Sequence, residues 1–375
     1  MKRMKKIFEG ILFMGILSGW LQGGVNVLKY NGTDSTLKDR LHWAENRVPD
    51  LDAESEYWVG YSIRKMMHKN CRTGTVYNDV VRRISLGELI TGMENADESY
   101  VQGSVTDSDI LISETDDNHP QVRKDVAILF FIPAGKKQLK ETSTIRMTNM
   151  DQHVDLKNRP VLWLGKADQD ESLDLLIPLY NKIKGNHEKK ACMMAIAIHD
   201  KKDRVVSFLE MRLNAREPEE IREHASFWLG QQEDDRALEI LKRTVNTDPS
   251  MEVREKSVFA VSQMDTKEAE NYLIDLAYHA KYREIRKKAV FWLGQKASEK
   301  SIEALKHVVF NAEITEIQEH AVFALSQQDN ADAVPELIRI MKTHPNPEVR
   351  KKAVFWLGET GDARGVDALV ELIRN

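Results

Sequence analysis

The chain has 375 residues, with 54 Lys and Arg against 59 Asp and Glu, so its formal net charge is -5. Abundant charges of both signs argue against a dedicated nucleic-acid-binding protein, which normally carries a basic stripe. The length leaves room for two domains and a sizeable core.

The first 24 residues predict an export signal. Four basic residues precede the apolar run Ile7–Leu21, and small residues follow it, which is the layout of a secretory signal peptide. The run is short for a transmembrane helix, which needs about 20 apolar residues. Because Glu9 interrupts the run and no A-x-A site follows, an uncleaved anchor in the inner membrane is the alternative. Either reading predicts an exported bacterial protein, periplasmic or secreted.

Two regions follow this segment. Residues 25–50 are expected to form a leader or linker, in which Leu37, Leu41 and Trp43 can dock one helical turn. Residues 51–156 show no long repeat and are expected to fold as a small α+β domain rich in strands.

Three segments of that domain show strand patterns. Apolar residues alternate along Tyr57–Arg64 and along Ser143–Thr148, while Val126–Ile132 is a continuous apolar run suited to a buried strand. The string PAGKK follows the continuous run, so this run and the next are predicted to form a hairpin. A helix is expected around Asn78–Leu89, and the acidic stretch Thr106–Gln121 is expected to be a loop.

Residues 157–375 are expected to form a helical solenoid with a period of 32 residues. Each unit reads as a helix with apolar residues at offsets 0, 4, 7 and 8, ended by glycine or serine, and then as a second amphipathic helix. A constant period of this length is the signature of stacked repeats. With degenerate units upstream, six to seven helix pairs are expected. The clear units begin IREHASFWLG at Ile221, VREKSVFAVS at Val253, IRKKAVFWLG at Ile285, IQEHAVFALS at Ile317 and VRKKAVFWLG at Val349.

The repeated strings, such as Glu348–Gly358, resemble HEAT-like repeats, in particular the short form of phycobilisome-lyase-like proteins. The resemblance covers roughly residues 189–375. It implies a right-handed superhelix of helix pairs that binds other proteins on the wide concave face of its second helices and rarely catalyses. The candidate partner-binding residues, placed by helix offset, are Arg243, Tyr272, His307 and Arg339.

The strand-rich region adds a second resemblance. The strings YWVGYSI, DVAILFFI and PVLWLGKADQDESLDLL, followed by the repeats, are similar to exported bacterial HEAT-repeat proteins with a strand-rich module in front. This resemblance implies a regulatory or scaffolding role in the cell envelope.

A second alternation overlies the repeat. Tryptophan at offset 7 alternates with Ala260 and Ala324, while Lys242 and Lys306 on the second helices alternate with isoleucines. We interpret this as volume compensation in a close-packed core. The string KKAVFWLG, which occurs twice, is then a packing unit, although exposed rings on one shared surface would favour a binding stripe. The predicted repeat core comprises Trp228, Trp292, Trp356, Phe227, Phe259, Phe291, Phe323 and Phe355.

The last helix breaks the alternation. Val370 occupies a position where lysine is expected, and with Val366, Leu369 and Ile373 it makes this helix apolar on more than one side. Terminal repeats usually carry a polar outer face. Contact with a partner or with a second copy of the chain is therefore expected here, and the alternative is a modest apolar end left in water.

The sequence gives little support for a metal site. The pairs Glu223-His224 and Glu319-His320 are similar to the His-Glu pairs of deoxyhypusine hydroxylase, a HEAT-like enzyme with a di-iron centre, but their order is reversed. The pairs are three units apart, and packed helices about 8–10 Å apart separate them by on the order of 30 Å. One site cannot span that distance, so no metal or cofactor is expected.

Other chemistry is equally sparse. No GxSxG, Walker, HExxH or EF-hand string occurs, and the aspartates around Asp107 and Asp116 lack the ligand spacing of a calcium loop. The two cysteines, Cys71 and Cys192, cannot build a disulfide scaffold. A single bridge between them stays open, and Cys192 within ACMMAIAI is typical of a small buried hydrophobe.

The sequence therefore predicts an α-solenoid preceded by a small strand-rich domain. Its expected function is a non-catalytic protein–protein interaction scaffold of the bacterial cell envelope, with residues 7–21 as a membrane tether in the anchored form. The alternative is an enzyme or small-ligand site around Tyr57–Tyr61, with the solenoid as its support. The expected partner is a protein and not a nucleic acid.

Overall fold

The structure is a computed structural model that describes residues 26–32, 35–47, 55–68, 85–91, 121–152, 154–232 and 234–374. The chain divides into two compact units, Met1–Lys201 and Lys202–Asn375. The predicted export signal, Cys71 and nearly all of the acidic stretch 106–121 lie outside the described residues. Within the described ranges, no helix is long and apolar enough to cross a membrane.

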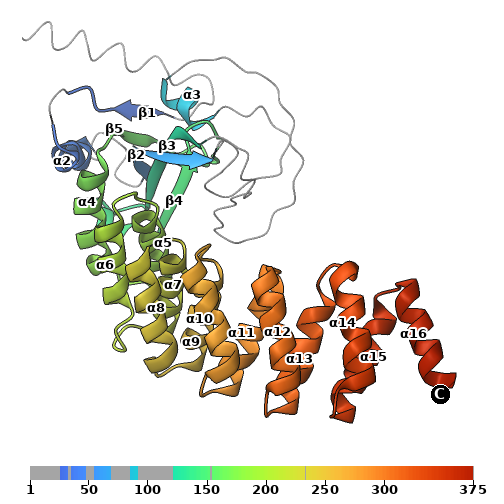
Figure 1. Ribbon diagram of the computed structural model, residues 1–375. Coiled ribbons are helices and arrows are strands. Elements are labelled where there is room, and N and C mark those ends of the chain that lie inside the picture. The colour runs from blue at the N-terminus through green and yellow to red at the C-terminus, as the bar shows by residue number, and fades with distance from the viewer. Residues whose placement is uncertain are drawn as a thin grey trace, which may run out of the picture. The chain divides into compact units, whose positions relative to one another are not determined.

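The first unit is built on a five-stranded mixed sheet with the order β1-β5-β2-β3-β4 (Figure 1). Strand β5 runs parallel to β1 and β2, whereas the pairs β2–β3 and β3–β4 are antiparallel. The three predicted strands and the predicted hairpin are present. The strands are β1 (Val27–Lys29), β2 (Tyr57–His68), β3 (Gln121–Ile132), β4 (Thr144–Asn149) and β5 (Val161–Lys166).

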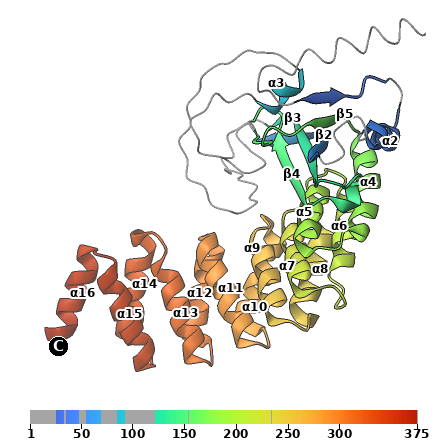
Figure 2. The ribbon, with the colours of Figure 1, turned by 180° about the vertical axis from the view of Figure 1, so that it is seen from behind.

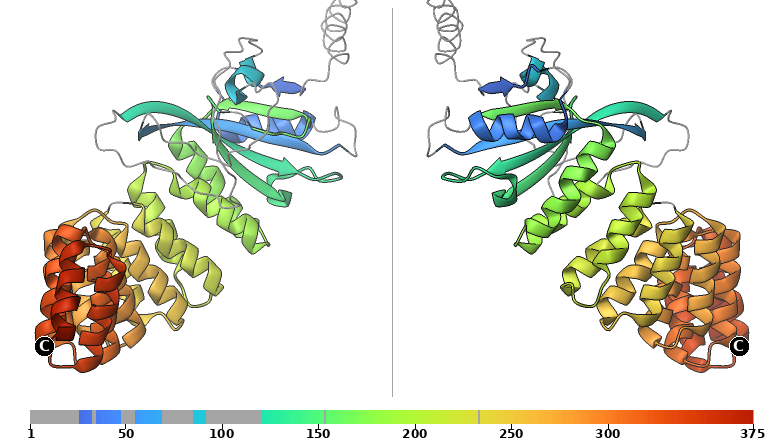
Figure 3. Two further views of the ribbon diagram at one scale, coloured as in Figure 1. Left: turned by 90° about the vertical axis from the view of Figure 1, so that its right-hand side faces the viewer. Right: turned by 90° about the vertical axis from the view of Figure 1, so that its left-hand side faces the viewer.

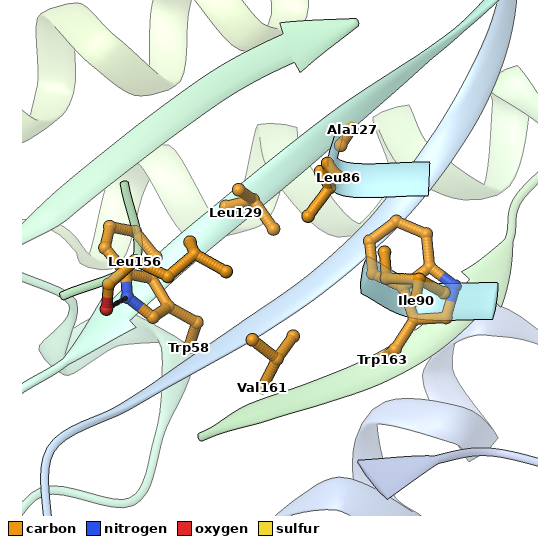
Figure 4. Packing of buried hydrophobic residues seen from close by; sticks show 8 residues of the cluster. All are labelled: Trp58, Leu86, Ile90, Ala127, Leu129, Leu156, Val161 and Trp163. Carbon is orange, nitrogen blue, oxygen red and sulfur yellow. Dashed lines mark hydrogen bonds between the residues drawn. The ribbon is translucent and has the colours of Figure 1, made fainter. Parts of the chain in front are cut away.

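Helices cover both faces of this sheet. On one face, Leu86 and Ile90 of α3 join Trp58 and Trp163 in a buried cluster (Figure 4). On the other face, Tyr61 reaches α4 through a hydrogen bond. The expected helix at 78–89 lies partly outside the described residues, within which α3 begins at Leu86. The helical elements of the unit are α2 (Leu37–Arg47), α3 (Leu86–Thr91), η3 (Leu139–Glu141), α4 (Gln169–Lys182) and α5 (Asn186–Ala197).

The expected domain boundaries differ from the structure. The linker 25–50 contains β1 and α2, and the region assigned to the solenoid from residue 157 begins with β5, a strand of the sheet. Six residues after a proline carry no periodicity that separates strand from helix, and proline is tolerated before the first residue of a strand. Helices α4 and α5 belong to the first compact unit.

The second unit is a stack of helix pairs (Figures 1 and 2). We call the first helix of each clear repeat an A helix and the second a B helix. The A helices begin at residues 219, 251, 283, 315 and 347, so the 32-residue period is kept without slippage. The bounds are α6 (Lys202–Arg212), α7 (Glu219–Gly230), α8 (Asp235–Thr247), α9 (Met251–Ser262), α10 (Lys267–His279), α11 (Arg283–Lys296), α12 (Glu299–Asn311), α13 (Thr315–Ser326), α14 (Asn330–Thr343), α15 (Pro347–Glu359) and α16 (Ala363–Arg374).

Each A helix packs on the next A helix, and the B helices α8, α10, α12 and α14 each pack on the A helices of their own and the following pair. Figure 3 shows the stacked helices from two further sides. The apolar offsets explain this arrangement: Ile285, Ala289 and Leu293 of α11 are all buried. Offsets 0, 4 and 8 lie within about 80° of each other on a helix of 3.6 residues per turn. The predicted two-helix repeat is therefore the packing unit of the array.

The arginine that follows the first apolar residue has a structural role. Arg286 donates to the Tyr278 carbonyl over 2.8 Å, and Arg350 donates to the His344 carbonyl over 2.7 Å. In the repeat that lacks this arginine, Gln318 donates to the Ala312 carbonyl over 2.8 Å. Carbonyls at the end of a B helix have no partner within the helix, so this side chain ties each B helix to the next A helix.

The alternation of large and small residues is found between successive A helices. A Cβ built on Gly230 would lie 2.5 Å from the Ala260 carbonyl oxygen, and one built on Gly294 would lie 2.9 Å from the Ala324 Cβ. Glycine thus permits close approach of α7 to α9 and of α11 to α13.

The predicted volume compensation between tryptophan and lysine names the wrong partners. At the intervening junctions, Trp292 contacts the ring of Phe259 on the preceding A helix. Lys242 and Lys306 instead form ion pairs with Glu239 and Glu303 on their own B helices. Pattern alone shows which positions vary together, but it does not show which of several neighbours fills the space.

Candidate partner-binding surface

The phenylalanine at offset 6 faces outward on every A helix. Offset 6 lies about 160° from the centre of the face formed by offsets 0, 4 and 8. Phe355 is 54% exposed and Phe291 is 38% exposed, while Phe227, Phe259 and Phe323 are half-buried. The assignment of these phenylalanines to the repeat core is therefore wrong, because they lie on the side opposite the packed stripe.

The tryptophans at offset 7 lie at the edge of the same surface. Trp228 is 2% exposed, whereas Trp292 and Trp356 are half-buried. Trp228 is thus a fully buried core residue, whereas Trp292 and Trp356 are mostly but not fully buried. We call the surface formed by these rings the aromatic ladder; its members are Phe227, Trp228, Phe259, Phe291, Trp292, Phe323, Phe355 and Trp356.

Rings of the aromatic ladder contact each other from helix to helix. Phe259 and Trp292 have ring centroids 4.8 Å apart, and Phe227 stacks on Phe259 at 6.2 Å with an interplanar angle of 15°. Within α11, Phe291 meets Trp292 edge-on at 4.9 Å. Such aromatic pairs add to the free energy of burial alone, so the ladder helps hold successive A helices together while part of its surface stays in water.

Basic side chains border the aromatic ladder. The ammonium group of Lys256 lies 5.2 Å from the ring centroid of Phe259, within cation–π range. Lys287 forms an ion pair with Glu316 at 2.7 Å, and Lys288 forms one with Glu255 at 3.1 Å. The surface around the rings is thus polar and charged, as is usual at the rim of a protein interface.

Two tryptophan indoles differ in their hydrogen bonding. Trp228 Nε1 donates to His224 Nε2 over 3.0 Å, one helical turn earlier. In α15 the equivalent position is Lys352, which cannot accept a hydrogen bond. The buried Trp356 Nε1 has no acceptor among the described residues.

The partner-binding residues predicted on the B helices all lie in the layer of B helices, but they do not form one cluster. Arg243 and Arg339 are exposed, and their guanidinium groups pair with Glu210 at 2.8 Å and with Glu336 at 2.9 Å. The hydrogen bonds from Arg243 and Arg236 lower the pKa of Glu210. These charges already have partners within the chain.

The remaining B-helix candidates vary in accessibility. Tyr272 is half-buried, its hydroxyl donates to the Lys242 carbonyl over 3.3 Å, and burial raises its pKa to about 12. His307 is exposed beside Tyr278, with ring centroids 4.6 Å apart. Val370 is 40% exposed on α16. Tyr278 was not among the predicted candidates, and it lies at the offset of Phe310 in the next repeat.

A cavity of about 420 Å³ opens beside Arg243. Its lining includes Glu210, Met211, Thr247 and Asp248 from the ends of α6 and α8. Glu210 is held by two arginines, and Asp248 forms a buried ion pair with Arg222 at 3.0 Å. The charged groups of this cavity are thus engaged in packing the repeats together.

The alternative site in the first unit is not at an accessible surface. Tyr57 and Tyr61 are both 0% exposed. The Tyr61 hydroxyl lies 2.8 Å from Ser172 Oγ, which lies 2.9 Å from His199 Nε2. Burial lowers the pKa of His199 to about 4, so its imidazole is neutral near pH 7. This buried chain of polar groups satisfies itself and packs α4 onto the sheet.

The Glu-His pairs and the cysteine weighed for metal or redox chemistry lie on separate helices. Glu223-His224 lies on α7 and Glu319-His320 lies on α13. In the part of the chain that the structure describes, no three His, Cys, Asp or Glu side chains are arranged to hold a metal ion. Cys192 is buried, its thiol faces the Leu176 carbonyl at 3.7 Å, and burial raises its pKa.

The stacked helix pairs define the second unit as an α-solenoid. Residues 206–294 and 302–375 match the sequence family of HEAT repeats. The second half of the chain is therefore a HEAT-repeat solenoid preceded by a five-stranded sheet with helices, which confirms the predicted fold class. HEAT repeats suggest a protein-binding scaffold.

Several solved structures are similar to part of this chain. The complex of CpcE and CpcF of phycocyanin lyase from Nostoc sp. PCC7120 is 20% identical, with 40% of this chain and 96% of that chain covered and a TM-score of 0.30. Human deoxyhypusine hydroxylase is also 20% identical, with 53% and 81% covered and a TM-score of 0.25.

Kap95p bound to RanGDP is 16% identical, with 50% of this chain and 29% of that chain covered and a TM-score of 0.32. At these identities and scores, nothing about activity or partner follows from the likeness. No curated protein matches the sequence.

Proposed function

We propose that this protein is a non-catalytic scaffold that binds a protein partner through the aromatic ladder on its A helices. The observation that carries the proposal is the outward position of the phenylalanine in all five A helices, with Phe291 and Phe355 more than one-third exposed. Apolar side chains gathered on one face with a polar rim are typical of protein-interaction sites. Aromatic residues are also the usual anchors of such interfaces.

The proposed surface differs from the one expected from the sequence. Among the expected B-helix residues, Arg243 and Arg339 pair with carboxylates of the same chain and present charge rather than exposed apolar area. On the A-helix face, the exposed area of Phe291 and Phe355 is apolar and gains free energy when it is buried, at about 25 cal/mol per Å².

We further propose that the protein is exported and that its partner is a protein. The basic and apolar layout of residues 1–24 supports export to the cell envelope, with a tether through residues 7–21 as the anchored form. The balanced charge supports a protein partner over a nucleic acid. The absence of a recognisable catalytic motif supports a scaffold without enzymatic activity.

The proposal is tested with paired variants. The double variant Phe291→Ala and Phe355→Ala is compared with the B-helix control Arg243→Ala and Arg339→Ala by in-cell crosslinking and mass spectrometry. Loss of one stoichiometric partner in the A-helix variant, with retention in the control, is the expected result. Loss in the control alone would overturn the proposal. Unchanged thermal unfolding of both variants excludes a folding defect.

A further inference from the structure

Two parts of the aromatic ladder have the same geometry. Each is a triad in which a phenylalanine of one A helix contacts the tryptophan of the next, and that tryptophan contacts its own neighbouring phenylalanine. We call these the first triad (Phe259, Trp292 and Phe291) and the second triad (Phe323, Trp356 and Phe355).

The corresponding distances and angles nearly coincide. Between helices, the ring centroids are 4.8 Å apart at 43° in the first triad and 5.0 Å apart at 46° in the second. Within a helix, both triads have centroids 4.9 Å apart, at 81° and at 82°. The third ring of each triad is exposed, by 38% at Phe291 and by 54% at Phe355. The structure thus presents one surface feature twice.

Two lysines accompany the tryptophan and the exposed phenylalanine of each triad, because these two rings lie in the repeated string KKAVFWLG, whereas Phe259 and Phe323 lie in the preceding repeats, which differ in sequence. The lysines stand three and four residues before the exposed phenylalanine, so they share its face of the helix. Lys351 is 81% exposed, and its contact with Glu348 is 4.0 Å long. Beside the first triad, Lys287 pairs with Glu316 at 2.7 Å and Lys288 pairs with Glu255 at 3.1 Å. Exposed ion pairs contribute little to stability, so carboxylates of a partner can compete for the lysines of both triads.

The distance between the two triads determines how far apart the two apolar groups of a ligand must lie. The two exposed phenylalanines are 64 residues apart, which is two repeats. With packed helices about 8–10 Å apart, two steps correspond to roughly 16–20 Å. An extended chain covers this distance in about five or six residues.

We propose that the two triads are equivalent docking points for one extended peptide segment that carries two apolar side chains, each flanked by acidic residues, about five or six residues apart. The inference rests on the proposed function, since it names the class of segment that the aromatic ladder binds. Simultaneous engagement of both triads raises the effective concentration of the second apolar group and tightens binding without any new type of contact.

The probes are synthetic peptides. The single peptide has Phe-Leu flanked on each side by two aspartates, and two tandem peptides carry this element twice, with the phenylalanines six residues apart or thirty residues apart across a Gly-Ser linker. Binding to the full chain is measured by titration calorimetry at two salt concentrations. The matched protein variants are Phe291→Ala, Phe355→Ala and the B-helix control Arg339→Ala.

We expect the single peptide to occupy two sites of equal affinity and the six-residue tandem peptide to bind one to one, at least about tenfold more tightly. Phe291→Ala or Phe355→Ala should leave one site for the single peptide and remove the tandem advantage, while Arg339→Ala changes neither. Affinity should fall as salt is raised.

One site for the single peptide, or an equal advantage at both tandem spacings, overturns the inference while leaving the proposed function intact. Absence of all peptide binding also overturns it. The proposed function fails separately, if the crosslinked partner is retained when both exposed phenylalanines are removed.

Discussion

At the scale of single residues, the tryptophans show how one substitution changes the environment of an unchanged side chain. Trp228 and Trp356 occupy the same offset, yet only the former has a histidine one turn earlier to accept its indole proton. A buried donor without a partner costs free energy relative to a satisfied one. The difference between the two repeats is therefore one of stability, independent of partner binding.

Supplying an acceptor should stabilise the last clear repeat. We expect Lys352→His to raise the free energy of unfolding by about 1 kcal/mol, because it recreates the bond between His224 and Trp228. Lys352→Leu serves as the control, since it removes the same charge without adding an acceptor. Urea unfolding of both variants measures the effect, and an equal shift in both would contradict the role given to the indole.

His199 should make the first unit sensitive to acid. Its pKa is about 4 in the folded protein, below its ordinary value, because burial disfavours the charged imidazole. The unfolded chain binds a proton as the pH falls through about 6.5, whereas the folded chain does so only near pH 4. The contribution to stability is therefore complete above pH 6.5 and is lost as the pH falls toward 4, by about 3 kcal/mol in total.

Urea unfolding of the wild-type chain and of His199→Gln at pH 7.5, 5.5 and 4.5 isolates this contribution from that of other titrating groups. The variant should be less stable at pH 7.5, because the hydrogen bond between Ser172 and His199 is altered, but it should lose less stability on acidification. Parallel pH profiles of the two proteins would exclude this role of His199.

At the scale of elements, the glycines that end the A-helix pattern have different neighbours. A Cβ on Gly294 would lie 2.9 Å from the Ala324 Cβ, whereas no atom of the described residues lies within 4 Å of one on Gly358. The two glycines occupy the same position of an identical eight-residue string. Their substitutions therefore separate helix propensity from packing.

We expect Gly294→Ala to destabilise the chain by about 1–3 kcal/mol through overpacking between α11 and α13. Gly358→Ala should instead stabilise it by about 0.5–1 kcal/mol, since alanine is the better helix former and meets no neighbour. Thermal and urea unfolding measure both changes. Shifts of the same sign in both variants would show that the close approach of the A helices is not needed.

The elements also show how far the sequence predicts the structure. The helix pairs follow from a constant period and from burial at fixed offsets, both of which depend on neighbours along the chain. Strand β5 cannot be predicted in this way. Its partners β1 and β2 are far away in sequence, and its short apolar run fits either a strand or a helix. The sequence shows that Phe291 and Phe355 recur at the same offset. Only the structure shows that both rings point away from the packed face of their helices.

At the scale of the whole molecule, apolar exposure is concentrated in the α15–α16 pair. Leu372 is 47% exposed and Ile373 is 85% exposed, although the equivalent Val308 and Val309 of α12 are almost fully buried. Leu372 and Ile373 thus form an exposed apolar face on α16.

We therefore expect the full chain to self-associate through this face at micromolar concentration. Ile373→Lys should shift it toward the monomer, because a buried charge without a partner is costly, while Phe355→Ala, which alters the aromatic ladder instead, should have less effect. Light scattering over a range of concentrations gives the mass directly. A wild-type mass equal to that of one chain at every concentration would rule out self-association through this face.

The central claim is that the A-helix layer, rather than the B-helix layer, binds the partner. The most direct test places a photo-crosslinking amino acid at residue 291 or 355 on the A helices and at residue 243 or 339 on the B helices, in the cells that produce the protein. The account predicts that one and the same protein is crosslinked from both A-helix positions and from neither B-helix position. Crosslinking of that protein from the B-helix positions alone would contradict it.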